Sequence, residues 1–174
     1  MKKGLMFAAT MLTVSLTLAA CGESTIEQKD TTEISSEVQE TKTIEKFAVG
    51  DTVVFDGTEV TLNELRTEAG GQFDTSSEGK FVVANITMKN TTAEEINVSS
   101  LFGFELKDAD GYSYNSTFLS EGTKGSLSGA IEPGGTLRGE IPFDVPDSDT
   151  YELHYSDLFK SGKAIWSISS TELN

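Results

Sequence analysis

The sequence has very few of the residues that form covalent crosslinks and histidine-rich metal sites. Its 174 residues include one cysteine, Cys21, and one histidine, His154. A single cysteine excludes an intrachain disulfide and a cluster of thiolate ligands, and a single imidazole excludes a metal site built from several histidines. The stability of a folded domain must therefore come from its hydrophobic core.

Basic residues are also scarce. The chain has 13 lysines and arginines against 28 aspartates and glutamates, which gives a formal net charge of −15. Nucleic acid binds proteins mainly through basic side chains, so we expect no nucleic-acid partner. An anionic lipid surface repels the same charge, so no polybasic patch is expected to hold this chain on a membrane.

The first twenty residues have the three parts of a secretory signal. Lys2 and Lys3 precede an apolar run, which ends in small residues. The motif Leu18-Ala19-Ala20-Cys21 resembles the lipobox of bacterial lipoproteins, and this resemblance implies cleavage before Cys21 and acylation of its thiol. Two alternatives are a plain Ala-Xaa-Ala cleavage site and an uncleaved anchor, for which the run is short. We predict a lipoprotein signal peptide at residues 1–20, with membrane lipid as a partner through acylated Cys21.

Residues 21–46 follow the signal and differ from it in composition. They are mostly Glu, Thr, Ser, Lys and Gln, with few apolar residues and no aromatic residue. Such a segment cannot bury enough apolar surface to fold, so we predict a disordered acidic tether. A random chain of this length spans about 25 to 30 Å.

A folded domain is predicted at residues 47–174, where apolar and polar residues begin to alternate. The two clearest strands are residues 81–89 and 137–145. Pro142 removes a backbone donor from the second strand and therefore predicts a sheet edge or a bulge. A turn at Asn90 is expected to lead from the first strand into a return strand with Ile96 and Val98.

The remaining elements are also short strands. Phe102, Phe104 and Leu106 alternate before Asp108-Ala109-Asp110-Gly111, which predicts a hairpin turn because glycine supplies a positive φ. No sustained helical period follows Phe47, although residues 156–160 could form one turn. The fold class is therefore all-β, an antiparallel β-sandwich of about seven to eight strands. The further expected strands are residues 52–55, 58–65, 151–155 and 164–168.

The order of strands and turns resembles a known family. The matching elements are Val49-Gly50-Asp51-Thr52-Val53, Gly79-Lys80-Phe81-Val82-Val83, Lys89-Asn90, Asp108 to Gly111, Glu132-Pro133-Gly134-Gly135 and Gly139 to Val145. They resemble the immunoglobulin-like domains of bacterial lipoproteins known as domain of unknown function 4352. The resemblance implies an immunoglobulin-like sandwich, related in fold to a secreted mycobacterial antigen. It implies no catalytic group.

Candidate catalytic residues do not form a convincing set. His154 lies between two apolar residues of a strand, so we expect its side chain to face solvent. The segment Gly125-Ser126-Leu127-Ser128-Gly129 only superficially matches the nucleophile motif Gly-Xaa-Ser-Xaa-Gly, which requires a strand-to-helix turn. We therefore expect no enzyme and no cofactor. Residues 120–129 are predicted to be a mobile loop at one end of the sandwich, where binding usually occurs.

Three carboxylates near Pro146 are the one candidate metal site. Asp144, Asp147 and Asp149 could bind Ca²⁺ if backbone carbonyls completed the coordination shell. The alternative is a solvated acidic turn, which is the commoner use of such a sequence.

Taken together, these features predict a membrane-anchored extracytoplasmic lipoprotein that acts as a non-enzymatic binding or accessory module. The expected location is the outer face of the cytoplasmic membrane of a Gram-positive bacterium, and the expected partner is an envelope protein or ligand. The alternative is a carrier of a small ligand or calcium that is associated with a transporter.

Overall fold

The computed structural model describes residues 26–28, 45–157 and 162–174. The predicted signal peptide, the lipobox Leu18-Ala19-Ala20-Cys21 and most of the predicted tether lie outside the described residues. None of the described helices is long and apolar enough to cross a lipid bilayer.

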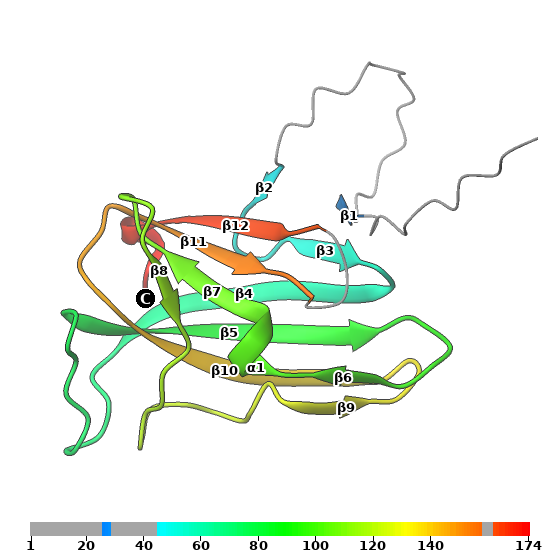
Figure 1. Cartoon of the computed structure of the whole chain (residues 1–174), viewed down its shortest axis with the longest axis horizontal. Helices are drawn as coiled ribbons and strands as arrows, with labels where there is room; N and C mark the ends of the chain where they lie inside the picture. The colour runs from blue at the N-terminus through cyan, green and yellow to red at the C-terminus, as the bar shows by residue number, and fades with distance from the viewer. Residues whose placement is uncertain (1–25, 29–44, 158–161) are drawn as a thin grey trace, which may run out of the picture.

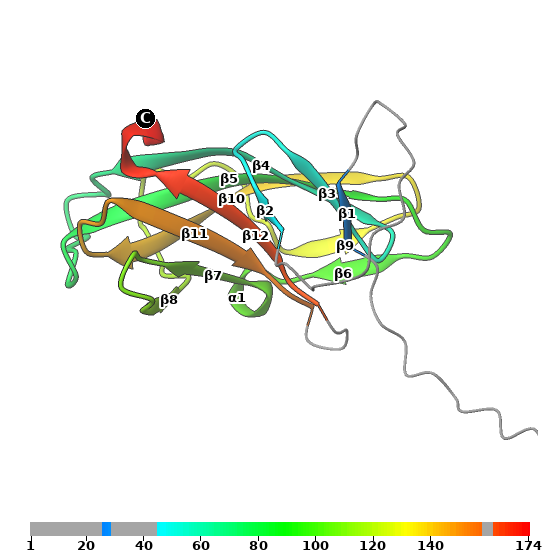
Figure 2. The same ribbon diagram turned by 90° about the horizontal axis from the view of Figure 1, so that it is seen from above.

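Two five-stranded sheets lie face to face, as Figures 1 and 2 show. The first sheet has the order β1-β3-β4-β5-β10, and all of its neighbouring strands are antiparallel. Its strands are β1 (Ile26–Gln28), β3 (Thr52–Phe55), β4 (Thr58–Glu68), β5 (Lys80–Asn90) and β10 (Thr136–Val145).

The second sheet has the order β2-β12-β11-β7-β8, in which only β2 and β12 are parallel. Its strands are β2 (Lys46–Phe47), β7 (Phe104–Lys107), β8 (Ser113–Asn115), β11 (Thr150–Tyr155) and β12 (Ala164–Ser169). A small ribbon joins β6 (Ile96–Val98) to β9 (Gly129–Ile131). The two short helices are α1 (Ser100–Gly103) and η1 (Ser170–Glu172).

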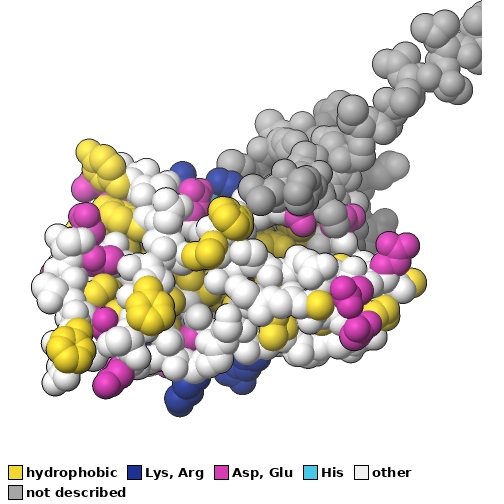
Figure 3. All heavy atoms as spheres, turned by 60° about the horizontal axis from the view of Figure 1, so that its bottom comes forward, with side chains coloured by type: hydrophobic (Ala, Val, Ile, Leu, Met, Phe, Trp, Pro, Cys, Tyr) yellow, Lys and Arg dark blue, Asp and Glu magenta, His cyan; other side chains and the backbone are white. Residues whose placement is uncertain are grey.

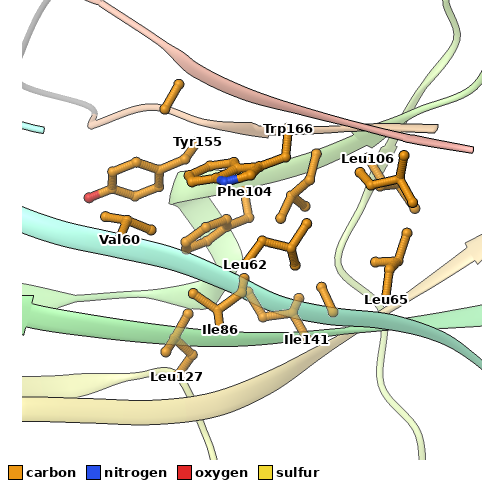
Figure 4. Packing of buried hydrophobic residues seen from close by; sticks show 14 of the residues in the cluster. Val60, Leu62, Leu65, Ile86, Phe104, Leu106, Leu127, Ile141, Tyr155 and Trp166 are labelled. Atoms are coloured by element: carbon orange, nitrogen blue, oxygen red, sulfur yellow. The ribbon is translucent and has the colours of Figure 1, made fainter. Parts of the chain in front are cut away.

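The core fills the space between the two sheets (Figure 4). Its members come from alternate positions of the strands, because successive side chains of a strand point to opposite faces. On β5, for example, Val82, Ala84, Ile86 and Met88 are fully buried in this core. Trp166 enters it from β12, and its indole N–H donates a hydrogen bond to the backbone oxygen of Asp51. The prediction of an all-β sandwich is confirmed.

Most of the predicted strands are present. The two clearest ones form β5 and β10, which pair over ten residues, and β10 lies at the edge of its sheet, as Pro142 predicted. The predicted hairpin joins β7 to β8, with Gly111 at φ +89°.

Two strand predictions need a correction: the strand with Ile96 and Val98 is present as β6 but has another neighbour, and the strand with Phe104 and Leu106 was predicted too long. Residues 96–98 do not return beside β5 but pair with β9, which places them in a separate ribbon. Phe102 does not continue the strand of Phe104 and Leu106, because it belongs to α1 and its ring is exposed.

Part of the predicted tether is ordered. Ile26–Gln28 forms β1 beside β3, and Lys46 belongs to β2. The physical reason is that the free edge of a sheet offers unpaired backbone donors and acceptors, which an extended segment can satisfy whatever its side chains are. The helical turn predicted at residues 156–160 is not seen at Ser156 and Asp157, and its other residues lie outside the described part of the chain.

The segment 116–127, called the strap below, covers the edge of β10. Ser116 bridges Phe143 and Ser126 bridges Glu140, while the backbone N–H of Thr117 donates to the oxygen of Pro142. Leu127 is 0% exposed and joins the same core cluster as Ile86 and Ile141 (Figure 4). Residues 120–128 form a loop, as predicted, Gly129 begins β9, and a buried leucine anchors the loop along the sheet.

Candidate functional site

Two segments at one end of the sandwich expose large aromatic side chains. Phe73 lies in the β4–β5 loop, residues 69–79, and its ring is 84% exposed. Phe118 lies near the start of the strap and is 81% exposed. Figure 3 shows hydrophobic side chains standing clear of the surface at this end. We call Phe73, Phe118 and the two segments that carry them the aromatic loop pair.

A single carboxylate joins the two segments of the aromatic loop pair. Asp74 Oδ2 accepts hydrogen bonds from the backbone N–H of Gly71 at 2.7 Å, and from the backbone N–H and hydroxyl of Ser120 at 2.9 Å each. The Gly71 bond contributes most to lowering the pKa of Asp74 below its ordinary value; burial opposes this shift, and the Ser120 bonds reinforce it. The carboxylate therefore stays ionised and holds both segments together near neutral pH.

Apolar packing supports the same junction. Leu119, between Phe118 and Ser120, is buried against Phe81 and Val83 on the outer face of β5. A Cβ at Gly71 would lie 2.4 Å from the hydroxyl of Ser120, so a larger residue there would push the two segments apart. The backbone that carries both exposed rings is therefore held by buried or hydrogen-bonded neighbours.

A second aspartate fixes the other half of the β4–β5 loop. Asp144 accepts hydrogen bonds from the hydroxyls of Ser76 and Ser77, at 2.5 and 2.8 Å, and from the backbone N–H groups of Ser77 and Glu78. Burial opposes ionisation of Asp144, but these bonds outweigh it and lower its pKa. Asp144 therefore stabilises a loop by capping donors that would otherwise need water.

The three predicted calcium ligands are not brought together. Asp144 faces the serines of the β4–β5 loop, whereas Asp147 is 95% exposed in side chain and lies 2.9 Å from Lys80 Nζ. The backbone oxygen of Asp149 accepts a hydrogen bond from Ser170. Within the described residues, no group of three or more His, Cys, Asp or Glu side chains is placed to hold a metal ion. The structure therefore does not group Asp144, Asp147 and Asp149 as the predicted set of calcium ligands.

His154 is buried, contrary to the expectation that it faces solvent. It does point away from the core, but it is only 6% exposed because charged side chains of the same sheet surround it. Its Nε2 lies 3.0 Å from Glu152, and its Nδ1 lies 3.4 Å from Glu105. Burial lowers the pKa of His154, Glu152 opposes that shift, and Lys163 and Lys107 add to it. Of the two serines in residues 125–129, Ser126 lies on the strap, and Ser128 lies just before β9, where its hydroxyl shares a hydrogen bond with that of Ser100.

One small cavity lies beside α1 and the end of β11. It has a volume of about 160 Å³ and is lined in part by Val98, Phe102 and Tyr155. Ligand pockets usually have about 300 Å³ or more, so this hollow suits a single side chain better than a metabolite.

The comparison with protein families decides the affiliation. The domain of unknown function DUF4352 matches residues 47–165. The chain belongs to this family. Among curated proteins, none matches significantly.

Solved structures of similar fold come from several bacteria. A "putative lipoprotein (ycdA)" of Bacillus subtilis has a TM-score of 0.55 and 21% identity, with 67% of this chain covered. This chain spans only 37% of that protein's length. The yjhA protein of Bacillus subtilis has a TM-score of 0.57 and 17% identity, covering 73% of this chain and 99% of its own.

A third solved structure of similar fold is the secreted protein MPT63 of Mycobacterium tuberculosis. It has a TM-score of 0.50 and 13% identity, covering 74% of this chain and 99% of its own. Because all three identities are low, these likenesses establish a shared β-sandwich fold. They confirm the relationship that the strand and turn pattern implied.

Sequence reasoning missed the aromatic loop pair. The signal was present in Gly70-Gly71-Gln72-Phe73-Asp74, where a large aromatic residue lies within a turn-forming stretch. Such a residue has no strand period through which to reach the core. An aromatic residue in this context points to an exposed contact residue.

Proposed function

We propose that this chain is a lipid-anchored, extracytoplasmic binding module that recognises a protein partner through the aromatic loop pair. The observation that supports it most directly is the combination of two phenyl rings more than 80% exposed with loops held by Asp74 and Leu119. Rings in fixed positions lose little conformational entropy on binding. Aromatic anchors of this kind carry a large share of the energy in protein interfaces.

The chemistry around the rings indicates the kind of partner. Asp74, Glu78 and Glu121 lie on the same two segments, and the whole chain is strongly acidic. A complementary surface would have an apolar pocket for each ring and a rim of lysine or arginine. Burying one phenyl ring from water contributes about 1.5–3 kcal/mol, so the two rings together provide substantial affinity.

The proposed location follows from the lipobox and agrees with the relatives. Leu18-Ala19-Ala20-Cys21 predicts an anchor at Cys21, and proteins of similar fold include one described as a lipoprotein and one described as secreted. Strand β1, which follows Cys21 most closely, lies toward the end of the domain opposite the β4–β5 loop (Figures 1 and 2). An anchor at Cys21 would thus leave the aromatic loop pair directed away from the membrane. In this proposal the protein performs no catalysis.

Site-specific crosslinking in intact cells tests the proposal. A photoreactive residue replaces Thr75, beside Phe73, in the anchored wild-type protein and in the double variant Phe73→Ser, Phe118→Ser. We expect discrete protein adducts that disappear in the double variant. A matched control, Phe102→Ser, removes another exposed phenyl ring on α1 and should leave the adducts unchanged.

Two further measurements make the result interpretable. Thermal unfolding should be the same for the wild type and the double variant, because neither ring is part of the core. Cys21→Ala, which removes the lipid attachment, should reduce the adducts. Protein adducts that persist in the double variant would contradict the proposed site. Binding of the unlipidated chain to vesicles that requires both rings would identify a lipid surface instead.

A further inference from the structure

The segment between the predicted lipid anchor and the domain contains a strand of the domain's own sheet. Ile26, Glu27 and Gln28 of β1 are opposite Phe55, Val54 and Val53 of β3 in an antiparallel register. β3 is paired on its other side to β4, so β1 forms the outermost strand of the sheet. The domain therefore has an edge that accepts a piece of the chain leading to Cys21.

The position of β1 determines how far the domain can lie from Cys21. Four residues, 22–25, separate Cys21 from Ile26. Even fully extended, the five Cα steps from Cys21 to Ile26 span at most about 17 Å. Without β1 the connection runs to Lys46, whose 25 steps reach about 25 to 30 Å as a random chain and about 85 Å when fully extended.

We propose that pairing of β1 with β3 is a reversible latch that sets the height of the domain above the membrane. The latch rests on the lipid anchor of the proposed function, but not on the identity of the partner. With β1 paired, the β3 edge is held close to the lipid surface. When β1 is released, the tether between Cys21 and the domain is about twice as long when it is a random chain and up to about five times as long when fully extended, so the aromatic loop pair reaches farther from the membrane.

The contacts of β3 explain why the latch can open without unfolding the domain. Val53 and Phe55 point into the core, where they pack within the main cluster together with residues of β4, β5 and the second sheet. β3 also keeps its four-residue pairing with β4. Release of β1 therefore removes backbone hydrogen bonds along three residues and leaves the core intact.

The entropy of the chain that connects β1 to the rest of the domain opposes the pairing of β1 with β3. Between Gln28 of β1 and Glu45, sixteen residues are closed into a loop when β1 pairs with β3. Closing such a loop costs entropy, which three residue pairs have to offset. A short edge strand of this kind belongs to the least stable part of a fold.

Hydrogen exchange on the unlipidated chain that starts at Cys21 tests the pairing itself. The variant Ile26→Pro, Glu27→Pro, Gln28→Pro removes the backbone donors on both sides of β1, since successive N–H groups of a strand point in opposite directions. A matched control, Ser35→Pro, Ser36→Pro, Glu37→Pro, changes the same number of residues outside β1. We expect faster exchange in Thr52–Phe55 for the first variant only. Equal exchange in all three proteins would overturn the proposal.

Energy transfer on vesicles then tests the height. Coupling Cys21 to a maleimide lipid supplies the anchor independently of cellular acylation, and a dye attached after Asn174 reports its distance to labelled lipid. Transfer should fall by at least a third in the β1 proline variant and match the wild type in the control. Equal transfer in all three proteins would refute the proposal that the latch sets the height of the domain, even if β1 pairs with β3. Loss of the aromatic-dependent crosslinks would instead refute the proposed binding site, so the two failures are distinguishable.

Discussion

The two edges of the sheet β1-β3-β4-β5-β10 are both covered by neighbouring chain, but in different ways. At the β10 edge, the strap combines backbone contacts to Pro142 and Glu140 with the buried side chain of Leu127. At the β3 edge, the cover is β1, which pairs over three residues. The strap contributes a side chain to the hydrophobic core, whereas β1 is three residues long and pairs only with β3.

This difference shows what makes an edge permanently closed. Backbone pairing at a sheet edge exchanges hydrogen bonds with water for hydrogen bonds within the protein, so its net contribution is small. Burial of an apolar side chain adds a hydrophobic contribution that pairing alone lacks. The strap should therefore open only when the domain unfolds, whereas β1 can exchange while the domain stays folded.

The largest effect is expected when the strap loses its buried anchor. Leu127→Ala would leave a cavity in the core and should lower the free energy of unfolding by about 3 kcal/mol. Chemical denaturation measures the loss. Phe118→Ala, nine residues earlier and exposed, should change it by less than about 0.5 kcal/mol. Similar losses for both variants would show that the strap does not belong to the core.

A smaller loss is expected when the strap is pushed off β10. A Cβ at Gly139 would lie 2.4 Å from the backbone nitrogen of Leu127 and 2.5 Å from the carbonyl carbon of Ser126. Gly139→Ala should therefore cost about 2 kcal/mol, because backbone atoms must move to accommodate the methyl group. The control Gly134→Ala meets no atom within 4 Å, although its φ of +76° adds some strain. Thermal unfolding compares the two variants, and equal stability would contradict the close approach of the strap.

A pH-dependent effect is expected at Glu140, which contacts the strap through the backbone N–H of Lys124 at 2.8 Å. Burial opposes ionisation of Glu140, but hydrogen bonds from Asn85, Lys124 and Arg66 outweigh it and lower the pKa. A lowered folded-state pKa contributes stability above the ordinary value near 4.5, and this contribution is lost as pH falls through the folded-state pKa. Glu140→Gln should lower the free energy of unfolding by about 1–2 kcal/mol at neutral pH. Below neutral pH, the stability of this variant should fall less steeply with pH than that of the wild type.

The measurement for Glu140 is denaturation at several values from pH 7 to pH 3. The Glu59→Gln variant is the matched control, because Glu59 pairs with Lys89 on β4 and β5, away from the strap. If the free energy of unfolding falls equally steeply with pH in the wild type and in Glu140→Gln, the carboxylate does not hold the strap.

The smallest effect is expected at the other edge. The β1 proline variant should change the free energy of unfolding by less than about 0.5 kcal/mol, because chain entropy offsets the short backbone pairing. Chemical denaturation measures it beside the proline control at residues 35–37. A loss as large as that of Leu127→Ala would remove the distinction between the two edges and make β1 an integral part of the core sheet.

The sequence predicted the strands better than it predicted the segments between them. β5 and β10 were found because apolar residues alternate over nine or more positions, and such a period favours one face of a sheet. Leu127 was missed because it is a single apolar residue among glycines and serines, which have no period. Phe102 was assigned to a strand because its spacing to Phe104 matched one, but the structure bends the chain into α1 at this point.

In the candidate site, too, the sequence predicted local features better than contacts between distant residues. Asp144 was predicted only as a calcium ligand, whereas its observed partners are Ser76 and Ser77, which are more than sixty residues earlier in the chain. His154 was placed on the correct face of β11, but its burial involves Glu105 on β7, which in turn pairs with Lys163 just before β12. A single sequence does not contain the distances between residues on separate strands.

The sequence by itself determined the lipobox motif, the acidic charge, the family and the longer strands, because each is encoded in consecutive residues or in a local period. The tertiary structure decided which strands lie at the edges, that the strap and β1 cover them, and that Asp74 joins the two segments that carry Phe73 and Phe118. Those features arise from contacts between residues far apart in the chain. Their energies depend on burial, which exists only once the two sheets have packed.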